Sequence, residues 1–110
     1  MNIYEFYDKP SDLISWNKHD PENLGIIEFK KDGKLHQIDG PAIEYLNGSK
    51  AWYINGELHR TDGPAKELSD GHKAWYLHGK RHRVDGPAIE YSDGYKAWYI
   101  HGKIQLNEYL

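Results

Sequence analysis

The chain lacks several features that mark common classes of protein. Its 110 residues include no cysteine, which excludes disulfide bonds and cysteine-ligated metal sites and fits a reducing compartment. No stretch approaches the roughly 20 apolar residues that span a membrane, and the first residues lack the basic and apolar regions of a signal peptide. We therefore expect a cytoplasmic protein that does not enter membranes.

Basic charge is not in excess, and known catalytic motifs are missing. Fourteen Lys and Arg against seventeen Asp and Glu give a formal net charge of −3, so the whole chain lacks bulk attraction for phosphate backbones or anionic lipids. The sequence contains no Gly-x-Ser-x-Gly, no phosphate-binding loop and no His-Glu-x-x-His. We therefore expect no catalytic residues and no cofactor, and the protein is not predicted to be an enzyme.

Glycine, by contrast, is regularly placed. All eleven glycines, from Gly25 to Gly102, follow one another at steps of seven or eight residues. Glycine favours tight turns because it adopts positive φ, and a turn at every eighth residue leaves room for strands of five or six residues. Aromatic residues make up 14% of the chain and apolar residues only 38%, so Trp and Tyr are expected to carry the core. The sequence predicts an all-β fold of short antiparallel strands.

The glycine ladder arises from an internal repeat of 23 residues. Three units begin at His36, His59 and His82, and 12 of their 23 columns are identical in all three. A fixed period of this length is typical of an array in which each unit packs on its neighbours. The units fill residues 36–104, a degenerate half-unit precedes them at 25–35, and the array as a whole spans 25–110.

Each unit is predicted to contain a hairpin at an Asn-Gly or Asp-Gly pair, which is a strong short-range hairpin signal. In the first unit, a two-residue loop at Asn47-Gly48 would place Tyr45 opposite Lys50. The Asp-Gly-Pro segment of each unit is expected to end one strand and begin the next, because proline cannot donate to a sheet ladder. Each unit would then supply three strands.

The two ends of the array are expected to differ from the repeat. Residues 1–24 do not repeat and are interpreted as an N-terminal cap, in which Ser11 would cap a short helical turn reaching Trp16. The functional alternative is that Trp16 and His19 dock a partner. Residues 105–110 abandon the motif and are expected to form a closing strand. Exposed terminal strands can pair edge to edge, so a homodimer stays an open alternative.

The units resemble the MORN repeat. The resemblance rests on the Trp-Tyr pairs with their following glycine, as in Trp75-Tyr76 and Gly79, and covers about two thirds of the chain. The His-Arg-x-Asp-Gly-Pro-Ala segment is similar to a variant found in phage, bacterial and large-virus proteins, some of them labelled antitoxin-like. The resemblance implies an elongated antiparallel β-meander repeat array, a scaffold or binding role, no catalytic residues and, for a viral source, the host cytoplasm.

Each unit carries a histidine and an aspartate three residues apart, His59 and Asp62 in the second unit. Such pairs raise the question of a metal site. With three strands per unit at about 4.8 Å, equivalent residues would lie about 14 Å apart, whereas zinc binds its ligands at about 2 Å. The three histidines therefore cannot share a metal, and no metal site is predicted. We expect each imidazole to donate a hydrogen bond to the turn carboxylate or the backbone.

Candidate binding residues come from the columns, that is, the aligned positions of the repeat, at which the three units differ. Columns that are identical in every unit serve a need shared by every unit, which is usually folding, so recognition is expected at the others. In the second and third units these columns are far more cationic than the chain as a whole, and Arg and Tyr are enriched at interfaces. The candidates are Arg60, His72, His78, Arg81, Arg83, Tyr95 and His101.

Three functions are compatible with these candidates. The favoured one is a non-enzymatic module that recognises another protein and could inhibit it, and the resemblance implies a host enzyme or a toxin as the target. One alternative is a protein that binds or sequesters an anionic small molecule such as a nucleotide signal, for which Arg60 or Arg83 would be essential. The other is nucleic-acid binding, with bases stacked on the Trp side chains.

Overall fold

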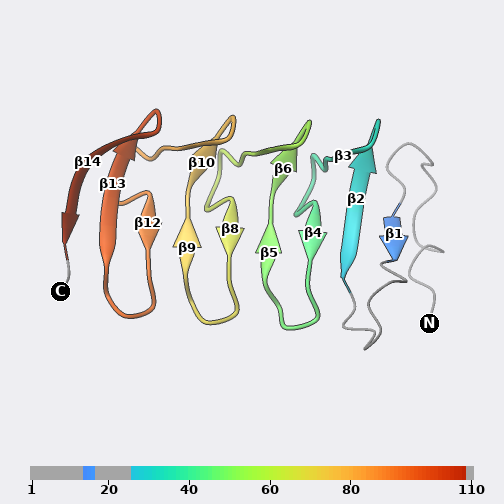
Figure 1. The fold of residues 1–110 in the computed structure, drawn as a ribbon, viewed down its shortest axis with the longest axis horizontal. Helices are drawn as coiled ribbons and strands as arrows, with labels where there is room; N and C mark the ends of the chain where they lie inside the picture. The colour runs from blue at the N-terminus through green and yellow to red at the C-terminus, as the bar shows by residue number, and fades with distance from the viewer. Residues whose placement is uncertain (1–13, 17–25, 109–110) are drawn as a thin grey trace.

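The computed structural model describes residues 14–16 and 26–108, which form an elongated all-β array of antiparallel strands (Figure 1). The predicted antiparallel meander is confirmed, because the strands of the main sheet follow one another in chain order. The main sheet runs β1 (Ile14–Trp16), β2 (Ile27–Lys31), β4 (Ile43–Glu44), β5 (Lys50–Ala51), β8 (Lys66–Glu67), β9 (Lys73–Ala74), β12 (Ile89–Glu90), β13 (Lys96–Ile100) and β14 (Lys103–Glu108). Short strands beside it are β3 (Lys34–Leu35), β6 (Tyr53–Ile54), β7 (Glu57–Leu58), β10 (Tyr76–Leu77) and β11 (Lys80–Arg81).

The first two units each contribute two strands to the main sheet, not the three that were predicted, and the third adds the beginning of β14 at the end of the array. We number the units 1 (36–58), 2 (59–81) and 3 (82–104). In unit 2, β8 pairs with β9, and the chain then continues through Trp75 into β10, which pairs with β11 at the upper edge of the array (Figure 1). The prediction was wrong because the residues after β11 leave the plane of the sheet. With two strands per unit, equivalent residues of neighbouring units lie about 9.5 Å apart.

The lower hairpins have three-residue loops, so the predicted two-residue loop is wrong. The register pairs Glu44 with Lys50, and the N–H of Tyr45 donates to the carbonyl of Ser49 at 2.9 Å. Gly48 has a φ of +94°, and its N–H donates to the carbonyl of Tyr45 at 2.9 Å. This is the hairpin in which a type I turn is followed by one left-handed residue, a position that suits glycine. The one-residue shift changes which side chains share a face.

The upper hairpins do have two-residue loops. His78 and Gly79, which join β10 to β11, have φ angles of 48° and 80°. Two successive left-handed residues make a type I′ turn, whose twist matches that of the paired strands. Asn55 and His101 adopt the same conformation in units 1 and 3.

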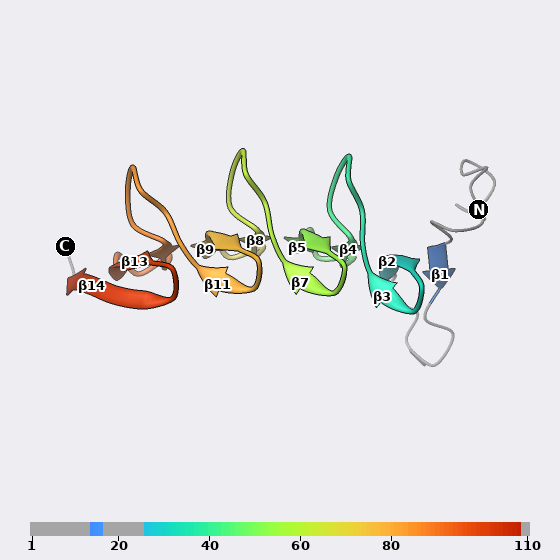
Figure 2. The same ribbon diagram turned by 90° about the horizontal axis from the view of Figure 1, so that it is seen from above.

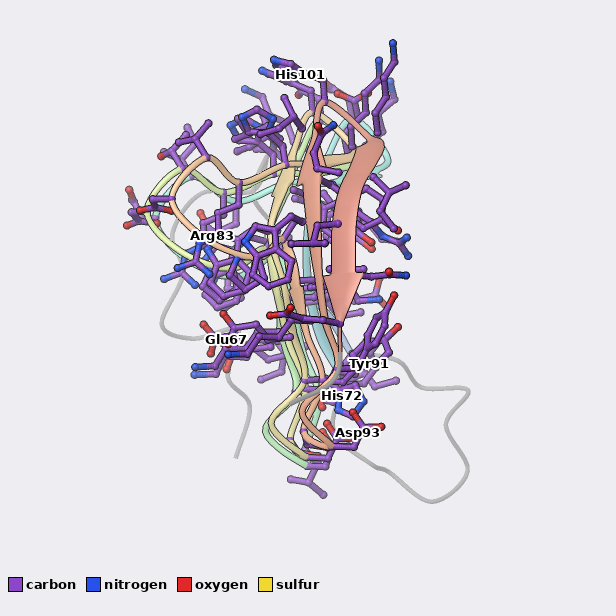
Figure 3. The ribbon with its side chains drawn as sticks, turned by 90° about the vertical axis from the view of Figure 1, so that its left-hand side faces the viewer. Glu67, His72, Arg83, Tyr91, Asp93 and His101 are labelled. Atoms are coloured by element: carbon purple, nitrogen blue, oxygen red, sulfur yellow. The ribbon has the colours of Figure 1, made fainter. Side chains whose placement is uncertain are left out.

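After each upper hairpin the chain crosses back over one side of the sheet, and these crossovers project as a row of loops (Figure 2). They contain the Asp-Gly-Pro segments. Backbone hydrogen bonds tie each crossover to the strand of the same unit, for example from the N–H of Arg60 to the carbonyl of Tyr76 at 3.1 Å. We call the side with the loops the loop face and the other side the open face; Figure 3 views the array end-on, with the two faces on opposite sides of the strands.

Alanine, not tryptophan, occupies the most deeply buried positions. Ala42, Ala65 and Ala88, each directly after a proline, have no exposed surface, whereas the repeat tryptophans are half-buried. Among the described residues no large side chain is fully buried. The expectation that Trp and Tyr form the core is therefore corrected: the repeat Trp and Tyr rings pack along the faces of a thin sheet, and the one buried Phe, Tyr or Trp among the described residues is Phe29, which is 4% exposed.

Strands close both ends of the described array. β1 pairs antiparallel with β2, so the helical turn predicted to reach Trp16 is wrong at Ile14–Trp16, where the free edge of β2 offers hydrogen bonds to an extended segment. The remainder of the expected cap at 1–24, including Ser11 and His19, lies outside the described residues. Of the closing strand expected at 105–110, residues 105–108 belong to β14, and residues 109–110 lie outside the described part of the chain. The described residues form no helix that is long and apolar enough to cross a membrane.

Candidate binding surfaces

Arg60 is held within the loop face by contacts that join two units. It donates to Asp62 Oδ1 at 2.9 Å and to Glu67 Oε2 at 2.9 Å. It also donates to the carbonyl of Pro64 at 3.0 Å, and its guanidinium carbon lies 3.8 Å from the centroid of the Trp52 ring. We call this set of contacts the arginine clamp. Since Trp52 belongs to the preceding unit, the clamp fastens unit 2 to unit 1.

The clamp recurs in unit 3 and depends on a glycine. Arg83 donates to Asp85 at 3.1 Å and to Glu90 at 3.0 Å, and it lies 3.8 Å from the centroid of the Trp75 ring. A Cβ atom at Gly86 would lie only 2.8 Å from Cζ of Arg83, so the guanidinium needs the bare backbone there. Two carboxylates neutralise the guanidinium of each clamp, which leaves little charge for a ligand.

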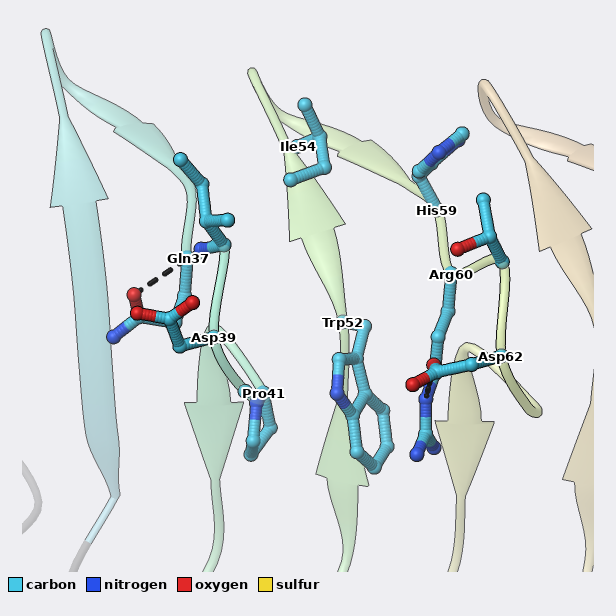
Figure 4. Close-up of a pocket in the computed structure, with 11 residues that line it drawn as sticks. Gln37, Asp39, Pro41, Trp52, Ile54, His59, Arg60 and Asp62 are labelled. Atoms are coloured by element: carbon cyan, nitrogen blue, oxygen red, sulfur yellow. Dashed lines mark hydrogen bonds and ion pairs between the residues drawn. The ribbon is translucent and has the colours of Figure 1, made fainter.

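Grooves separate successive loops of the loop face. The groove between the loops of units 1 and 2 has a volume of about 800 Å³ and is lined by Trp52, Asp39 and Asp62 (Figure 4). A groove of about 500 Å³ follows between the loops of units 2 and 3. The loop tips carry Ile38 and Val84, which are 77% and 81% exposed. Acidic side chains line these grooves, so they suit an anionic ligand poorly.

The repeated histidines bind the upper turns. Nδ1 of His59 accepts a hydrogen bond from the N–H of His78 at 3.0 Å, and the two ring centroids lie 4.4 Å apart. His82 and His101 repeat the arrangement at 2.9 Å and 4.3 Å. The predicted imidazole–backbone hydrogen bond is present, but its direction is the reverse of the prediction: a backbone N–H of the upper turn donates and the imidazole accepts. Burial, followed by the proximity of His78, lowers the pKa of His59 and so favours the neutral acceptor form.

In the part of the chain that the structure describes, no group of three or more histidine and acidic residues is placed to hold a metal ion. The structure instead gives each repeated histidine a separate hydrogen-bond partner in its own upper turn.

The open face presents three rows of side chains, and no described helix or second sheet layer covers them (Figures 2 and 3). The rows are Tyr53, Tyr76 and Tyr99; Ile43, Lys66 and Ile89; and Tyr45, Leu68 and Tyr91. The third row is the most open, with each side chain 40–41% exposed. Burial, followed by the neighbouring Tyr45 and Tyr76, raises the pKa of Tyr53, so its phenol stays neutral and can donate a hydrogen bond.

Positive charge prevails on the open face although the chain as a whole is acidic. The strand register places one carboxylate there among the described strand residues, Glu28 opposite Ile43, and Lys30 pairs with it at 3.4 Å. Lys66 and Arg81 have no carboxylate within 4.0 Å in the described part of the chain. Their charges are therefore not neutralised within this face.

A hollow of about 360 Å³ lies on the open face at unit 2, and we call it the unit-2 hollow. Its lining includes Lys66, Leu68, His72, Tyr76, Arg81 and Tyr91. The ring of His72 stacks on Tyr91 with centroids 4.6 Å apart, and Nδ1 of His72 lies 2.7 Å from Asp70 Oδ1 (Figure 3). The backbone N–H of His72, and then its ring, lower the pKa of Asp70, so this carboxylate at the rim stays ionised.

Arg81 crosses the upper part of the hollow between two tyrosines. Its Nε donates to the hydroxyl of Tyr76 at 3.3 Å, and its Nη1 donates to the hydroxyl of Tyr99 at 3.2 Å. The guanidinium carbon lies 5.2 Å from the centroid of the Tyr99 ring. The hydrogen bond to Tyr76 raises the pKa of Arg81, so the guanidinium stays charged. Both partners are neutral phenols, which orient the cation without neutralising it.

The seven candidate residues from the variable columns lie on three surfaces. His72, Arg81 and Tyr95 lie on the open face. His78 and His101 lie in the upper turns, and Arg60 and Arg83 form the clamps. The structure brings His72 and Arg81 together in the unit-2 hollow and keeps the clamp and turn residues away from it.

Sequence reasoning missed other residues of the hollow. Lys66 lies in a variable column, since units 1 and 3 have isoleucine there, but it was not included among the candidate residues. Tyr76 occupies an identical column, and nothing in the sequence separates it from the tyrosines of the other units. It acquires its place in the site only because Arg81 donates to its hydroxyl.

Comparisons with protein-family models, curated proteins and solved structures find no match to this chain.

Proposed function

We propose that this chain is a non-enzymatic binding module that recognises another protein through its open face. The observation that carries the proposal is the uncovered face of tyrosines in which Lys66 and Arg81 stand without carboxylate partners. Tyr and Arg are enriched among the residues that dominate binding energy at interfaces, and contiguous exposed apolar surface marks interaction sites. The resemblance to antitoxin-like MORN variants favours a host enzyme or a toxin as the partner, inhibited by the docking.

The breadth of the open face favours a protein over a small ligand. Tyr45 and Tyr91 are both 41% exposed and stand two units apart, which corresponds to about 19 Å along the sheet. Small-molecule sites are concave and enclose most of the ligand, whereas protein interfaces spread over flat surfaces of this extent.

The test compares two double variants that carry the same change on opposite faces. Tyr45→Glu/Tyr91→Glu places two carboxylates on the open face, and Ile38→Glu/Val84→Glu places two on the exposed tips of the loop face. Both variants lower the net charge equally, and circular dichroism checks that both remain folded. Wild type and variants serve as bait for proteins from cells that produce this chain, with quantitative mass spectrometry of the captured proteins.

We expect one protein to be captured by wild type and by the loop-face variant but lost from the open-face variant. If only the loop-face variant fails to capture the protein, the interface lies on the loop face instead. Capture that is unaffected by either variant would contradict recognition through the open face.

A further inference from the structure

Unit 2 departs from its neighbours at four positions of the open face, and all four line the unit-2 hollow. The repeat makes units 1 and 3 internal controls, because each position has an equivalent 23 residues before and after it. The four departures are Lys66 for Ile43 and Ile89, Leu68 for Tyr45 and Tyr91, His72 for Ser49 and Tyr95, and Arg81 for Leu58 and Ile104. These positions are separated in sequence, and only the fold brings them together.

The register explains why the departures meet. Lys66 and Ile89 both pair with Ala74, so the lysine and the isoleucine flank an alanine whose small side chain leaves the floor open. Arg81 pairs with Tyr76, two residues beyond Ala74 on the same strand path, and this brings the guanidinium to the upper end of the hollow. Leu68 in place of a tyrosine keeps the lower end open.

The two cations replace apolar side chains, and no described carboxylate lies within 4.0 Å of either; Asp70 at the rim lies against His72 instead. Withdrawing a cation from water is costly unless it is paired, and the chain does pair its other structural arginines: each clamp arginine binds two carboxylates. The side chain of Arg81 donates hydrogen bonds only to two phenol hydroxyls, and Lys66 has no carboxylate within 4.0 Å among the described residues. The charge complement of the hollow is therefore an oxyanion that the described residues do not supply.

We infer that the unit-2 hollow receives the carboxylate of an aspartate or glutamate on the partner protein. This inference rests on the proposed function, because the carboxylate arrives with a protein that docks on the open face. Lys66 and Arg81 would contact the carboxylate oxygens, while Tyr76 and Tyr99 hold the guanidinium in place. At about 360 Å³ the hollow is at the small end of ligand sites and lies open on the sheet, which suits one side chain better than an enclosed small molecule.

The test uses a blocked peptide of three Gly-Glu repeats as the acidic probe and the matching Gly-Gln peptide as the neutral control. Amide spectra of the ¹⁵N-labelled full chain are recorded during titration at low ionic strength, where charge pairing is least screened. We expect saturable shifts centred on Lys66, Leu68 and Arg81 with the Gly-Glu peptide and none with the Gly-Gln peptide.

The decisive variant is Lys66→Ile/Arg81→Leu, which installs the residues of unit 1 and therefore suits the fold. It is expected to bind the Gly-Glu peptide about tenfold or more weakly, because both charge-assisted contacts are lost. Its control is Lys80→Gln/Lys103→Gln, which removes two exposed charges elsewhere and should bind like wild type. If both variants weaken binding of the Gly-Glu peptide equally, general charge attraction explains the binding and the inference is overturned. Tighter binding of adenosine monophosphate at the same amides would overturn it in favour of a nucleotide.

Capture experiments separate this inference from the proposed function. If Tyr45→Glu/Tyr91→Glu loses the partner while Lys66→Ile/Arg81→Leu retains it at full affinity, the open face binds a protein but the carboxylate site is refuted. If neither variant affects capture, recognition through the open face fails as well.

Discussion

Replacing Gly86 by alanine is expected to destabilise the array by about 1.5 kcal/mol through displacement of Arg83. The new Cβ would lie 2.8 Å from Cζ and 3.0 Å from Nη1 of that arginine. Gly86 is not among the residues with positive φ, so alanine fits the backbone, and the collision with the guanidinium is the whole perturbation. Because the guanidinium ends a flexible side chain, it will move aside and the clamp will be lost.

The magnitude follows from the contacts that the clamp makes. The pair with Glu90, whose side chain is 34% exposed, contributes about 1 kcal/mol, and the pair with the 81% exposed Asp85 close to nothing. Stacking on Trp75 and the hydrogen bond to the carbonyl of Pro87 add about 0.5–1 kcal/mol each. Alanine also lowers the conformational entropy of the unfolded chain, which stabilises the variant by about 0.4–1 kcal/mol. The net loss in the free energy of unfolding is then about 1.5 kcal/mol.

The assay is urea unfolding, followed by Trp fluorescence and circular dichroism to give the free energy of unfolding. Gly40→Ala is the matched control: unit 1 has Gln37 in place of the clamp arginine, and an added Cβ there meets no atom within 4 Å. That variant should be neutral or slightly stabilised. In the background of Arg83→Met, Gly86→Ala should cost nothing further. An equal loss at Gly40, or an unchanged loss in the Arg83→Met background, would refute the clamp as the cause.

Three further predictions use the same unfolding assay. The lowered pKa of His59 means that protonation favours the unfolded chain, so the stabilisation from His59 is complete above the ordinary pKa of about 6.5 and declines below it. The variant His59→Asn keeps an acceptor for the N–H of His78 but cannot titrate, so its free energy of unfolding should fall less than that of wild type between about pH 7.5 and 5.5. An identical decline would contradict this. Gly94→Ala should cost about 1–2 kcal/mol, because φ is +100° there although space is free, and a neutral result would exclude backbone strain. Lys66→Ile should raise the free energy of unfolding by about 1 kcal/mol, since it buries apolar surface in place of an unpaired cation, and a decrease would show that the lysine is structural.

The fold could be predicted from glycine spacing because glycine marks turns directly, yet the same signal did not fix the length of each loop. Asn47-Gly48 fits a two-residue loop, in which both residues are left-handed, and also the observed three-residue loop, in which only the glycine is. Proline identified the end of a strand at each Asp-Gly-Pro segment. It did not indicate that the chain would leave the sheet plane there, which all three crossovers do (Figure 2), including that of unit 1, where Gln37 replaces the clamp arginine.

The site shows a similar limit for side chains. Arg60 and Arg81 both lie in variable columns, and the sequence criterion treats them alike. The fold gives Arg60 two carboxylates, Asp62 and Glu67, and gives Arg81 only tyrosine hydroxyls. The difference arises because the two arginines lie on opposite faces of the sheet. A face cannot be assigned until the hairpin register is known, and the predicted register was wrong by one residue.

Some residues differ from the repeat because they lie at an end of the array, whereas those of the unit-2 hollow lie in its middle unit. The clamp arginine is replaced by Gln37 in the first unit and by Leu106 after the third, where the array ends: Leu106 lies on β14 and pairs with Trp98 directly. Lys66 and Arg81 stand in the middle unit, with a repeat on each side, so no end of the array accounts for them. Isoleucine and leucine already fill the equivalent positions of unit 1, so apolar residues would suit the same backbone. Two cations in one hollow, with no described carboxylate within 4.0 Å of either, are therefore a stability cost confined to one unit. The carboxylate that we propose a docking partner supplies would offset this cost.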